Sequence, residues 1–166
     1  ESDLSVTVGA PVVVDLLSMS QALQAGVGSF PGECLDTLKL SASMYRPDPG
    51  LLDVVRDGRV ASESLYSNLL RSLCPVTGQP DIGSIQVIYT GTRIDHEALL
   101  RYIISFREHQ GFHEQCVERI FLDIMDRCRP RELTVYARYL RRGGIDINPY
   151  RSTEKGIPPH LRLARQ

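Results

Sequence analysis

The sequence has almost no net charge and no long apolar run. Its 19 lysines and arginines nearly balance 20 aspartates and glutamates, which gives a formal net charge of −1. A chain this close to neutrality offers no electrostatic attraction for nucleic acid or for acidic membrane surfaces. No apolar run approaches the roughly 18–20 residues of a bilayer-spanning helix, and no signal segment stands at the start. Repeats and low-complexity tracts are absent too, so we expect a cytoplasmic protein.

Cysteine is also scarce, and its positions fit neither a disulfide framework nor a zinc site. The four cysteines are Cys34, Cys74, Cys116 and Cys128, and their spacings match no zinc pattern. A chain of 166 residues, of which 42% are hydrophobic, can bury a core without disulfides. Cys116 and Cys128 fall on the apolar stripe of an expected helix, where cysteine packs as a small hydrophobic side chain. The exposure of Cys34, in a Pro-Gly-Glu loop, stays open, and only Cys74 has neighbours that suggest chemistry.

Hydrophobic periodicity predicts an α+β fold, with helices on one face of a mainly antiparallel sheet. Alternating apolar residues indicate half-buried strands, and apolar residues at helical spacing indicate two consecutive helices. After a valine-rich strand and a loop to about residue 36, the expected order is three strands, two helices and two strands. The expected strands cover residues 4–14, 38–44, 59–70, 84–89, 133–139 and 145–148. The first helix is expected to start at Asp95, the second to end at Arg129-Pro130, and the polar tail from residue 149 to form an arm.

The stretch Leu73-Cys74-Pro75-Val76-Thr77-Gly78-Gln79-Pro80-Asp81 places a thiol and a carboxylate on one short loop. Two prolines keep the loop out of a helix or a central strand, and Gly78 permits a turn. A cysteine nucleophile needs a group that handles protons, and Asp81 can fold back toward Cys74 within this loop. A carboxyl group beside a developing thiolate suits a general acid. The alternative is that Asp81 only caps a turn before Gly83.

A second candidate site is Phe112-His113-Glu114, at the start of the second expected helix. The Glu114 carboxylate would suit the amidine-like edge of a guanine ring, and His113 would supply a proton or position the reacting group. Phe112 would cover a planar ligand. Plainer alternatives stay open: Glu114 as a capping acid of the first helical turn, His113 as a solvent-exposed loop histidine, and Phe112 as a core aromatic.

A third candidate site is the basic turn Arg141-Arg142-Gly143-Gly144, which stands between two expected strands. Arginine side chains donate hydrogen bonds to phosphate oxygens, and glycine lets a phosphate approach the backbone closely. The turn therefore suits a phosphate group. A solvated hairpin is the alternative, because basic turns between strands are common.

Together these motifs resemble those of the 7-cyano-7-deazaguanine reductases, the nitrile reductases of queuosine biosynthesis. The resemblance is carried by the Cys74–Asp81 loop, Ser105-Phe106-Arg107, Phe112-His113-Glu114 and Arg142-Gly143-Gly144, and it extends from about residue 38 to residue 166. It implies the tunnelling fold, an antiparallel sheet with two helices on one face that closes into an oligomeric barrel.

The resemblance also implies a reaction. Cys74 would attack the nitrile carbon of 7-cyano-7-deazaguanine to form a covalent thioimide, and Asp81 would donate the proton to the nitrile nitrogen. One NADPH would reduce the thioimide, and a second would reduce the resulting imine to 7-aminomethyl-7-deazaguanine. Covalent attachment makes the carbon more electrophilic and keeps the intermediate from diffusing away.

The binding roles follow the same resemblance, with one departure. His113 and Glu114 would hold the deazaguanine ring, and Arg142 and Gly143 would contact NADPH; no metal is implied. Single-module members carry a Glu-Ser-Lys motif on the helix after the third strand, which serves substrate and cofactor. Here Glu97 stands where the lysine is expected, and a carboxylate cannot pair with a phosphate.

This departure is typical of the C-terminal half of the two-module form, whose N-terminal half carries the motif. Residues 1–36 would then be the end of the preceding module and the crossover, and residues 37–166 the C-terminal catalytic module. The chain begins at Glu1 rather than at a methionine, as expected of a fragment or a processed chain. A homodimer is expected, with the missing N-terminal module completing the site.

Two other functions suit the same fold. A zinc cyclohydrolase-like enzyme would need a cysteine–histidine metal set, and the sequence has no paired Cys-His motif near His113. A non-catalytic purine- or pterin-binding subunit would bind its ligand equally well with Cys74→Ala and would consume no NADPH.

Overall fold

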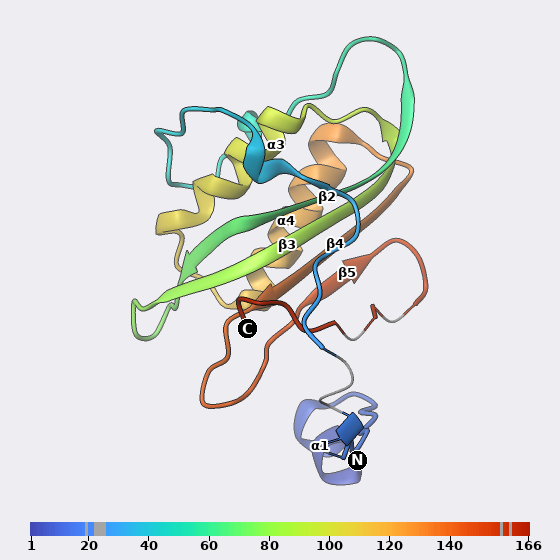
Figure 1. Cartoon of the computed structure of the whole chain (residues 1–166), viewed down its shortest axis with the longest axis vertical. Helices are drawn as coiled ribbons and strands as arrows, with labels where there is room; N and C mark the ends of the chain where they lie inside the picture. Colours follow the sequence, from blue (N-terminus) through green and yellow to red (C-terminus); the bar gives the residue numbers. More distant parts are fainter. Residues whose placement is uncertain (19, 22–25, 157, 160) are drawn as a thin grey trace.

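A five-stranded sheet forms the centre of the computed structural model, which describes residues 1–18, 20–21, 26–156, 158–159 and 161–166 (Figure 1). The expected loop to residue 36 and the expected tail from residue 149 lie partly outside these ranges. The strands follow one another across the sheet in chain order, and only the first pair is parallel. They are β1 (Glu33–Cys34), β2 (Val60–Leu73), β3 (Pro80–Thr92), β4 (Glu132–Tyr139) and β5 (Tyr150–Ser152). The α+β class and the mainly antiparallel pairing are confirmed.

Strands β2 and β3 form a long hairpin that carries Cys74 at its turn. The strands expected over 59–70 and 84–89 are confirmed and are longer than their patterns indicated. The pairing shifts register between Ser67 and Leu70. Asp36 fills this irregularity, because its carboxylate accepts the Ser67 hydroxyl at 2.6 Å and the Asn68 N–H at 3.0 Å. One carboxylate thus fixes the segment that follows β1 onto the sheet.

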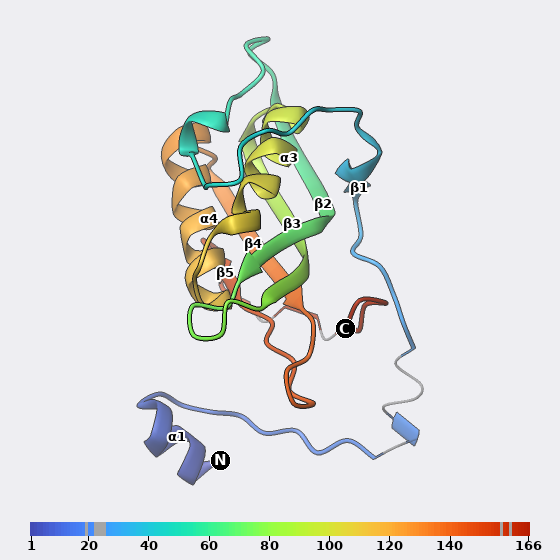
Figure 2. The same cartoon turned by 90° about the vertical axis from the view of Figure 1, so that its left-hand side faces the viewer.

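Helices α3 (His96–Ile104) and α4 (His113–Cys128) cover one face of the sheet, as expected (Figure 2). Asp95 caps α3, because its carboxylate accepts the Ala98 N–H at 2.8 Å. Arg129 ends α4 with a left-handed φ of 48°, and Pro130 follows. The apolar faces of both helices bury large side chains against the sheet: Leu99, Leu100, Ile103, Ile104, Val117, Ile120, Phe121 and Ile124. Within the described ranges, no helix is long and apolar enough to cross a membrane.

The opposite face of the sheet is covered by two chain segments, residues 26–32 and 161–166 (Figure 2). Gly28 N–H donates to the Arg162 carbonyl at 2.8 Å, and Leu163 is buried against Phe30 and Tyr136. The tail was expected to be a polar arm, which is wrong for its described end. Leu163 finds an apolar site on the sheet that no local sequence pattern indicates.

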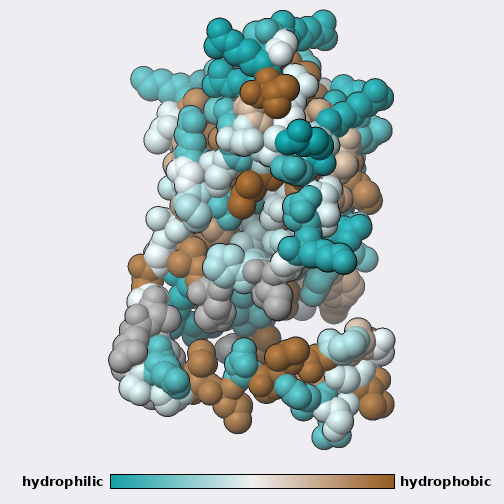
Figure 3. All heavy atoms as spheres, turned by 90° about the vertical axis from the view of Figure 1, so that its right-hand side faces the viewer, coloured by the Kyte–Doolittle hydropathy of each residue, from teal (hydrophilic) through white to brown (hydrophobic). Residues whose placement is uncertain are grey.

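The N-terminal segment is not a strand, contrary to expectation. Residues Ser2–Val8 form the helix α1, which ends at Gly9 in a left-handed conformation (φ 68°) and buries none of its residues. A valine-rich segment forms a strand only where a neighbouring strand pairs with it, and none of the described strands does so here. Local helical hydrogen bonds form instead. The segment lies apart from the sheet, and its apolar side chains gather on the surface (Figure 3).

Two further strand predictions are wrong: residues 38–44 do not form a strand, and the strand expected at residues 145–148 begins later in the chain. Within residues 38–44, Leu38, Leu40 and Ala42 pack against the core as the alternation predicts, but Met44 is exposed and the segment pairs with no described strand. The edge of β2 is already occupied by β1. The returning strand expected at 145–148 begins instead at Tyr150, because residues 143–144 turn tightly and the chain only approaches β4 at Ile147 and Pro149.

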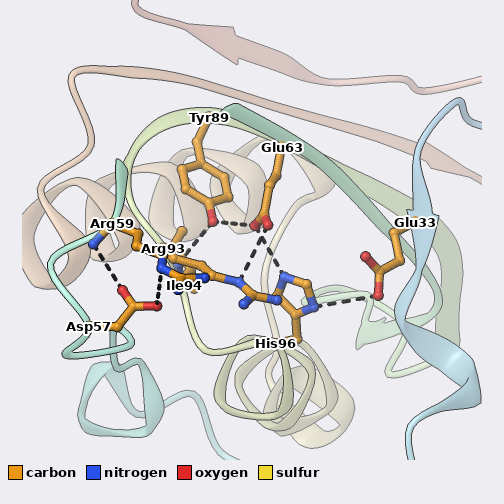
Figure 4. Close-up of polar contacts among 8 residues, drawn as sticks. All are labelled: Glu33, Asp57, Arg59, Glu63, Tyr89, Arg93, Ile94 and His96. Carbon is orange, nitrogen blue, oxygen red and sulfur yellow. Dashed lines mark hydrogen bonds and ion pairs between the residues drawn. The ribbon is translucent and has the colours of Figure 1, made fainter. Parts of the chain in front are cut away.

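A polar cluster closes the end of the hairpin that lies away from Cys74 (Figure 4). The Glu63 carboxylate accepts the Tyr89 hydroxyl at 2.5 Å and lies 3.1 Å from His96 Nε2, while His96 Nδ1 lies 3.6 Å from Glu33. Tyr89 in turn accepts the N–H of Ile94 at 2.9 Å. Burial alone would raise the pKa of Glu63, but the hydrogen bonds from Tyr89 and His96 outweigh it and lower the pKa. The cluster joins β1, β2, β3 and the start of α3.

Candidate functional site

The three sequence motifs meet at one pocket of about 190 Å³ at the Cys74 end of the sheet. The pocket is formed by the β2–β3 turn, the start of β3, the start of α4 and the chain after β4. Its lining residues are Cys74, Pro75, Asp81, Phe112, His113, Glu114, Arg142 and Ile147. Of the predicted site residues, only Gly143 is missing from this lining. It lines a neighbouring cavity of about 510 Å³ that shares Asp81 and Arg142 with the first.

Backbone hydrogen bonds explain why distant segments converge on this pocket. Leu73 N–H donates to the His109 carbonyl at 2.8 Å, and Gly111 N–H donates to the Leu73 carbonyl at 3.1 Å. These bonds place the start of α4 beside the end of β2. Leu140 N–H donates to the Ile82 carbonyl at 2.9 Å, which extends the β3–β4 pairing and brings the following basic turn to Asp81.

Cys74 begins a tight hairpin turn rather than a free loop. Its N–H donates to the Gln79 carbonyl at 2.8 Å, and its carbonyl accepts the Gly78 N–H at 2.9 Å. Gly78 has a φ of 71°, a conformation that favours glycine. Pro80, which was expected to keep the loop out of a strand, is instead the first residue of β3. A proline is tolerated at that position of a strand.

The turn lowers the pKa of the Cys74 thiol. The largest cause is the hydrogen bond from the Thr77 hydroxyl, followed by the backbone N–H groups of Thr77 and Val76, and Arg142 adds a smaller electrostatic contribution. All of these stabilise the thiolate, which is the nucleophilic form. The loop motif identifies Cys74 as reactive but does not indicate Thr77 as its partner, although the Thr77 hydroxyl lies in the same turn.

We expect Thr77→Val to raise the pKa of Cys74, because it removes the strongest donor to the sulfur while keeping the side chain's shape. Iodoacetamide reacts with the thiolate, so alkylation of Cys74 at pH 7 should slow severalfold in the variant. Above the pKa of both proteins the rates should converge. The measurement is the pH profile of alkylation, followed by intact mass. Equal profiles for the two proteins would contradict this assignment.

Asp81 is the buried centre of the site. It is 5% exposed and lies in β3, opposite Ser72. The Arg142 guanidinium donates to Asp81 Oδ1 through Nε at 2.8 Å and also through Nη2, and His113 Nε2 lies 3.0 Å from the same oxygen. Gly83 also lies within β3, so the alternative that Asp81 only caps a turn before it is wrong. Sequence reasoning predicted neither partner of Asp81, because both lie far away along the chain.

His113 is held between Asp81 and an aromatic ring. It is 5% exposed, so the alternative of a solvent-exposed loop histidine is wrong. Its ring stacks on that of Tyr139, with centroids 4.0 Å apart and planes inclined by 10°. Tyr139 packs closely on Gly83, where a Cβ atom would lie 3.0 Å from the tyrosine ring. The sequence pattern marked Tyr139 only as a strand residue, so its contact with His113 was missed.

The neighbours of His113 remain accessible. Phe112 caps α4 and is 52% exposed, so the core-aromatic alternative is wrong. Its backbone N–H donates to Gln115 Oε1 at 3.1 Å. Glu114 is exposed in the first turn of α4 and lines the pocket, so both the capping role and a ligand-binding role stay compatible with its position.

The basic turn is built on two glycines. Arg142 and Ile145 exchange backbone hydrogen bonds of 3.0 Å across Gly143 and Gly144, whose φ values are 57° and 83°. A Cβ at either glycine would meet nothing within 4 Å, so this backbone is open to a ligand. Arg141 pairs with Asp146 at 3.0 Å. Arg142 faces inward, where it donates to Gln79 Oε1 at 3.1 Å as well as to Asp81.

The other predicted residues lie away from the pocket. Cys116 and Cys128 are buried in the core, as expected, and burial raises the pKa of both thiols. Cys34 is half-buried beside Tyr66. Glu97 pairs with Arg101 at 2.6 Å on the surface of α3. Glu97 follows the far end of β3, and this strand spans roughly 40 Å at about 3.3 Å per residue.

The fold and the site define an α+β protein in which a hairpin turn presents an activated thiol beside a buried carboxylate–histidine pair. Residues 80–157 match the family model described as QueF-like protein. The chain is 54% identical over 165 residues to the NADPH-dependent 7-cyano-7-deazaguanine reductase of Burkholderia multivorans, and 53% identical to that of Paraburkholderia phymatum. Each match covers 99% of this chain and 60% of the relative. The chain is thus similar to these reductases along almost its whole length, in agreement with the resemblance of its motifs, and it spans about 60% of theirs.

The fold has a counterpart among solved structures. The crystal structure of the archaeosine synthase QueF-Like in the apo form matches with a TM-score of 0.50 at 15% sequence identity, covering 62% of this chain and all of that one. At this identity the similarity supports the fold alone.

Proposed function

We propose that this chain carries the catalytic centre of an NADPH-dependent 7-cyano-7-deazaguanine reductase, an enzyme of tRNA queuosine biosynthesis. One observation carries the proposal: a single pocket brings together the activated thiol of Cys74, the buried carboxylate of Asp81, and the His113–Glu114 pair. The names of the relatives supply the substrate and the cofactor. The proposed reaction also implies a cytoplasmic location.

In the proposed covalent step the Cys74 thiol adds across the nitrile. The sulfur forms a bond to the nitrile carbon, one carbon–nitrogen π bond breaks, and the nitrogen gains the proton that the thiol gives up. No external proton or reductant is needed. Asp81, with His113 beside it, is placed to accept and return this proton. The described partners of Asp81 contact Oδ1, which leaves Oδ2 for the proton. The product is a thioimide on Cys74.

The ring of the substrate would be held by α4. Glu114 stands at the pocket, and its two carboxylate oxygens match the paired N–H donors of a guanine-like edge. The exposed Phe112 ring would cover the planar base, and His113 would lie next to the reacting group. This arrangement would bring the nitrile to Cys74.

NADPH, when bound, supplies hydride to the thioimide and then to the imine released from Cys74. The residues after β4 suit its phosphates, because the Gly143–Gly144 backbone is open beside the larger cavity. Arg142 lines that cavity too, although its guanidinium is engaged by Asp81 and Gln79. We therefore assign the cofactor contact to Gly143 and to the exposed edge of Arg142.

We further propose that residues 37–166 are the C-terminal catalytic module of a two-module protein with a tunnelling fold, and that residues 1–36 are the end of the preceding module and the crossover. The pocket of about 190 Å³ is smaller than the roughly 300–1,000 Å³ of most small-molecule sites, which supports completion by a further part of the protein. The exposed apolar side chains of residues 4–17 support packing against such a part. A homodimeric barrel follows from the same proposal.

The test is the oxidation of NADPH by the two-module protein and by this chain alone, with 7-cyano-7-deazaguanine as substrate. We expect the two-module protein to consume two NADPH for each nitrile converted to the amine. Binding of the nitrile with no NADPH consumption, and with equal affinity in Cys74→Ala, would instead identify a non-catalytic binding protein. Activity that depends on zinc would favour a cyclohydrolase-like enzyme.

A further inference from the structure

Arg142 stands between the two cavities of the site and is bound to the residue that they share. Its Nε and Nη2 both donate to Asp81 Oδ1, and its Nη1 donates to Gln79 Oε1 at 3.1 Å. Every nitrogen of the guanidinium is thus directed at the Cys74 turn or at the start of β3. An arginine that served only a phosphate would keep its paired donors available to that phosphate.

The contacts are distributed unequally over the Asp81 carboxylate. Arg142 and His113 both contact Oδ1, whereas Oδ2 has no hydrogen-bond partner in the described part of the chain. Asp81 lines the same pocket as Cys74, and the residue as a whole is 5% exposed. Because Oδ1 is held in place, the position of Oδ2 is fixed as well, and Oδ2 is the carboxylate oxygen that remains to exchange a proton in the pocket.

We propose that Arg142 is a positioning residue for the covalent step: it orients Asp81 so that Oδ2 transfers the proton from the Cys74 thiol to the nitrile nitrogen. This inference rests on the proposed function, and it gives Arg142 a role before any cofactor takes part. Gln79 supports the same arrangement from the turn, because it holds the third nitrogen of the guanidinium. The Cys74 turn and the carboxylate are thereby locked together through one side chain.

Formation of the thioimide needs no NADPH, so the covalent step can be measured separately. The experiment follows the intact mass of the two-module protein after mixing with 7-cyano-7-deazaguanine in the absence of NADPH. Arg142→Gln should slow adduct formation roughly 10- to 100-fold, because it removes two charged hydrogen bonds to Asp81. Arg142→Lys, which keeps the charge and one donor, should recover part of the lost rate.

Two further variants keep the test decisive. Arg131→Gln is the matched control: this arginine pairs with Glu132 at 3.5 Å, has a side chain 74% exposed, and should form the adduct at the wild-type rate. Gln79→Leu removes only the outer support of Arg142 and should slow the step severalfold even if Arg142→Gln does not fold.

The outcomes distinguish this inference from the proposed function. A wild-type protein that forms no adduct would overturn the proposed function itself. A wild-type adduct, together with Arg142→Gln and Gln79→Leu variants that react at the wild-type rate and differ only in the KM for NADPH, would show that Arg142 serves the cofactor alone and would overturn the inference.

Discussion

Replacing Cys74 by alanine should abolish both the covalent adduct and NADPH oxidation, with a loss of at least roughly 10⁴-fold in kcat. Removal of a nucleophile has the largest effect of any substitution in a covalent mechanism, because the remaining groups cannot form the intermediate. The fold should be unaffected: Cys74 lies in a turn, is only partly buried, and makes its turn hydrogen bonds through the backbone. Intact mass and NADPH absorbance measure the two losses.

The matched control is Cys34→Ala, which removes a second half-buried thiol, in β1 and outside the lining of the pocket. This variant should keep the adduct and most of the wild-type turnover. Loss of activity in both variants, or an adduct that persists in Cys74→Ala, would exclude Cys74 as the nucleophile. Cys116 and Cys128 are unsuitable controls, because both are buried in the core and their substitution would leave cavities.

The parts of the fold that sequence predicts well are those whose patterns report burial directly. In α4 the apolar stripe that includes Cys116, Ile120 and Ile124 is buried as its spacing indicated, and Asp95 caps α3 through its own side chain. Residues 38–44 show the limit of such a pattern. Their alternation correctly marks Leu38, Leu40 and Ala42 as packed against the core, although Met44 is exposed. Pairing also depends on whether a strand edge is available, and β1 occupies that edge of β2.

The pocket, like the fold, could be predicted in part: its residues could be predicted, but the contacts among them could not. Short motifs identified Cys74, Asp81, His113, Glu114 and Arg142 as candidates, and the fold brings all five to one place. The contacts among them were not predictable, because a motif identifies residue types but not the partners that the topology supplies. Asp81 and Arg142 are joined because β4 pairs with β3 and then turns at Gly143, which is a property of the sheet rather than of either motif.

The same contacts determine what Asp81→Asn should do. The amide keeps the size of the carboxylate but cannot accept and return a proton, so adduct formation should slow by roughly 10²- to 10⁴-fold, the usual range for a general acid–base group. Asp146→Asn is the matched control, since this acid also pairs with an arginine, Arg141 at 3.0 Å, in the neighbouring turn and should retain the wild-type rate. Stopped reactions analysed by intact mass give both rates.

Because Arg142 is proposed to act through Asp81, the effects of Arg142→Gln and Asp81→Asn on the rate of adduct formation should not be additive. Asp81→Asn removes the group that Arg142 positions, so adding Arg142→Gln should slow adduct formation little further, although the latter substitution alone has a large effect. Independent roles would instead multiply the two losses, and the double variant would then react far more slowly than Asp81→Asn. A single Asp81→Asn variant that reacts near the wild-type rate would remove the proton-transfer role from Asp81. It would leave His113, whose Nε2 lies 3.0 Å from Asp81 Oδ1, as the remaining described group placed to supply the proton.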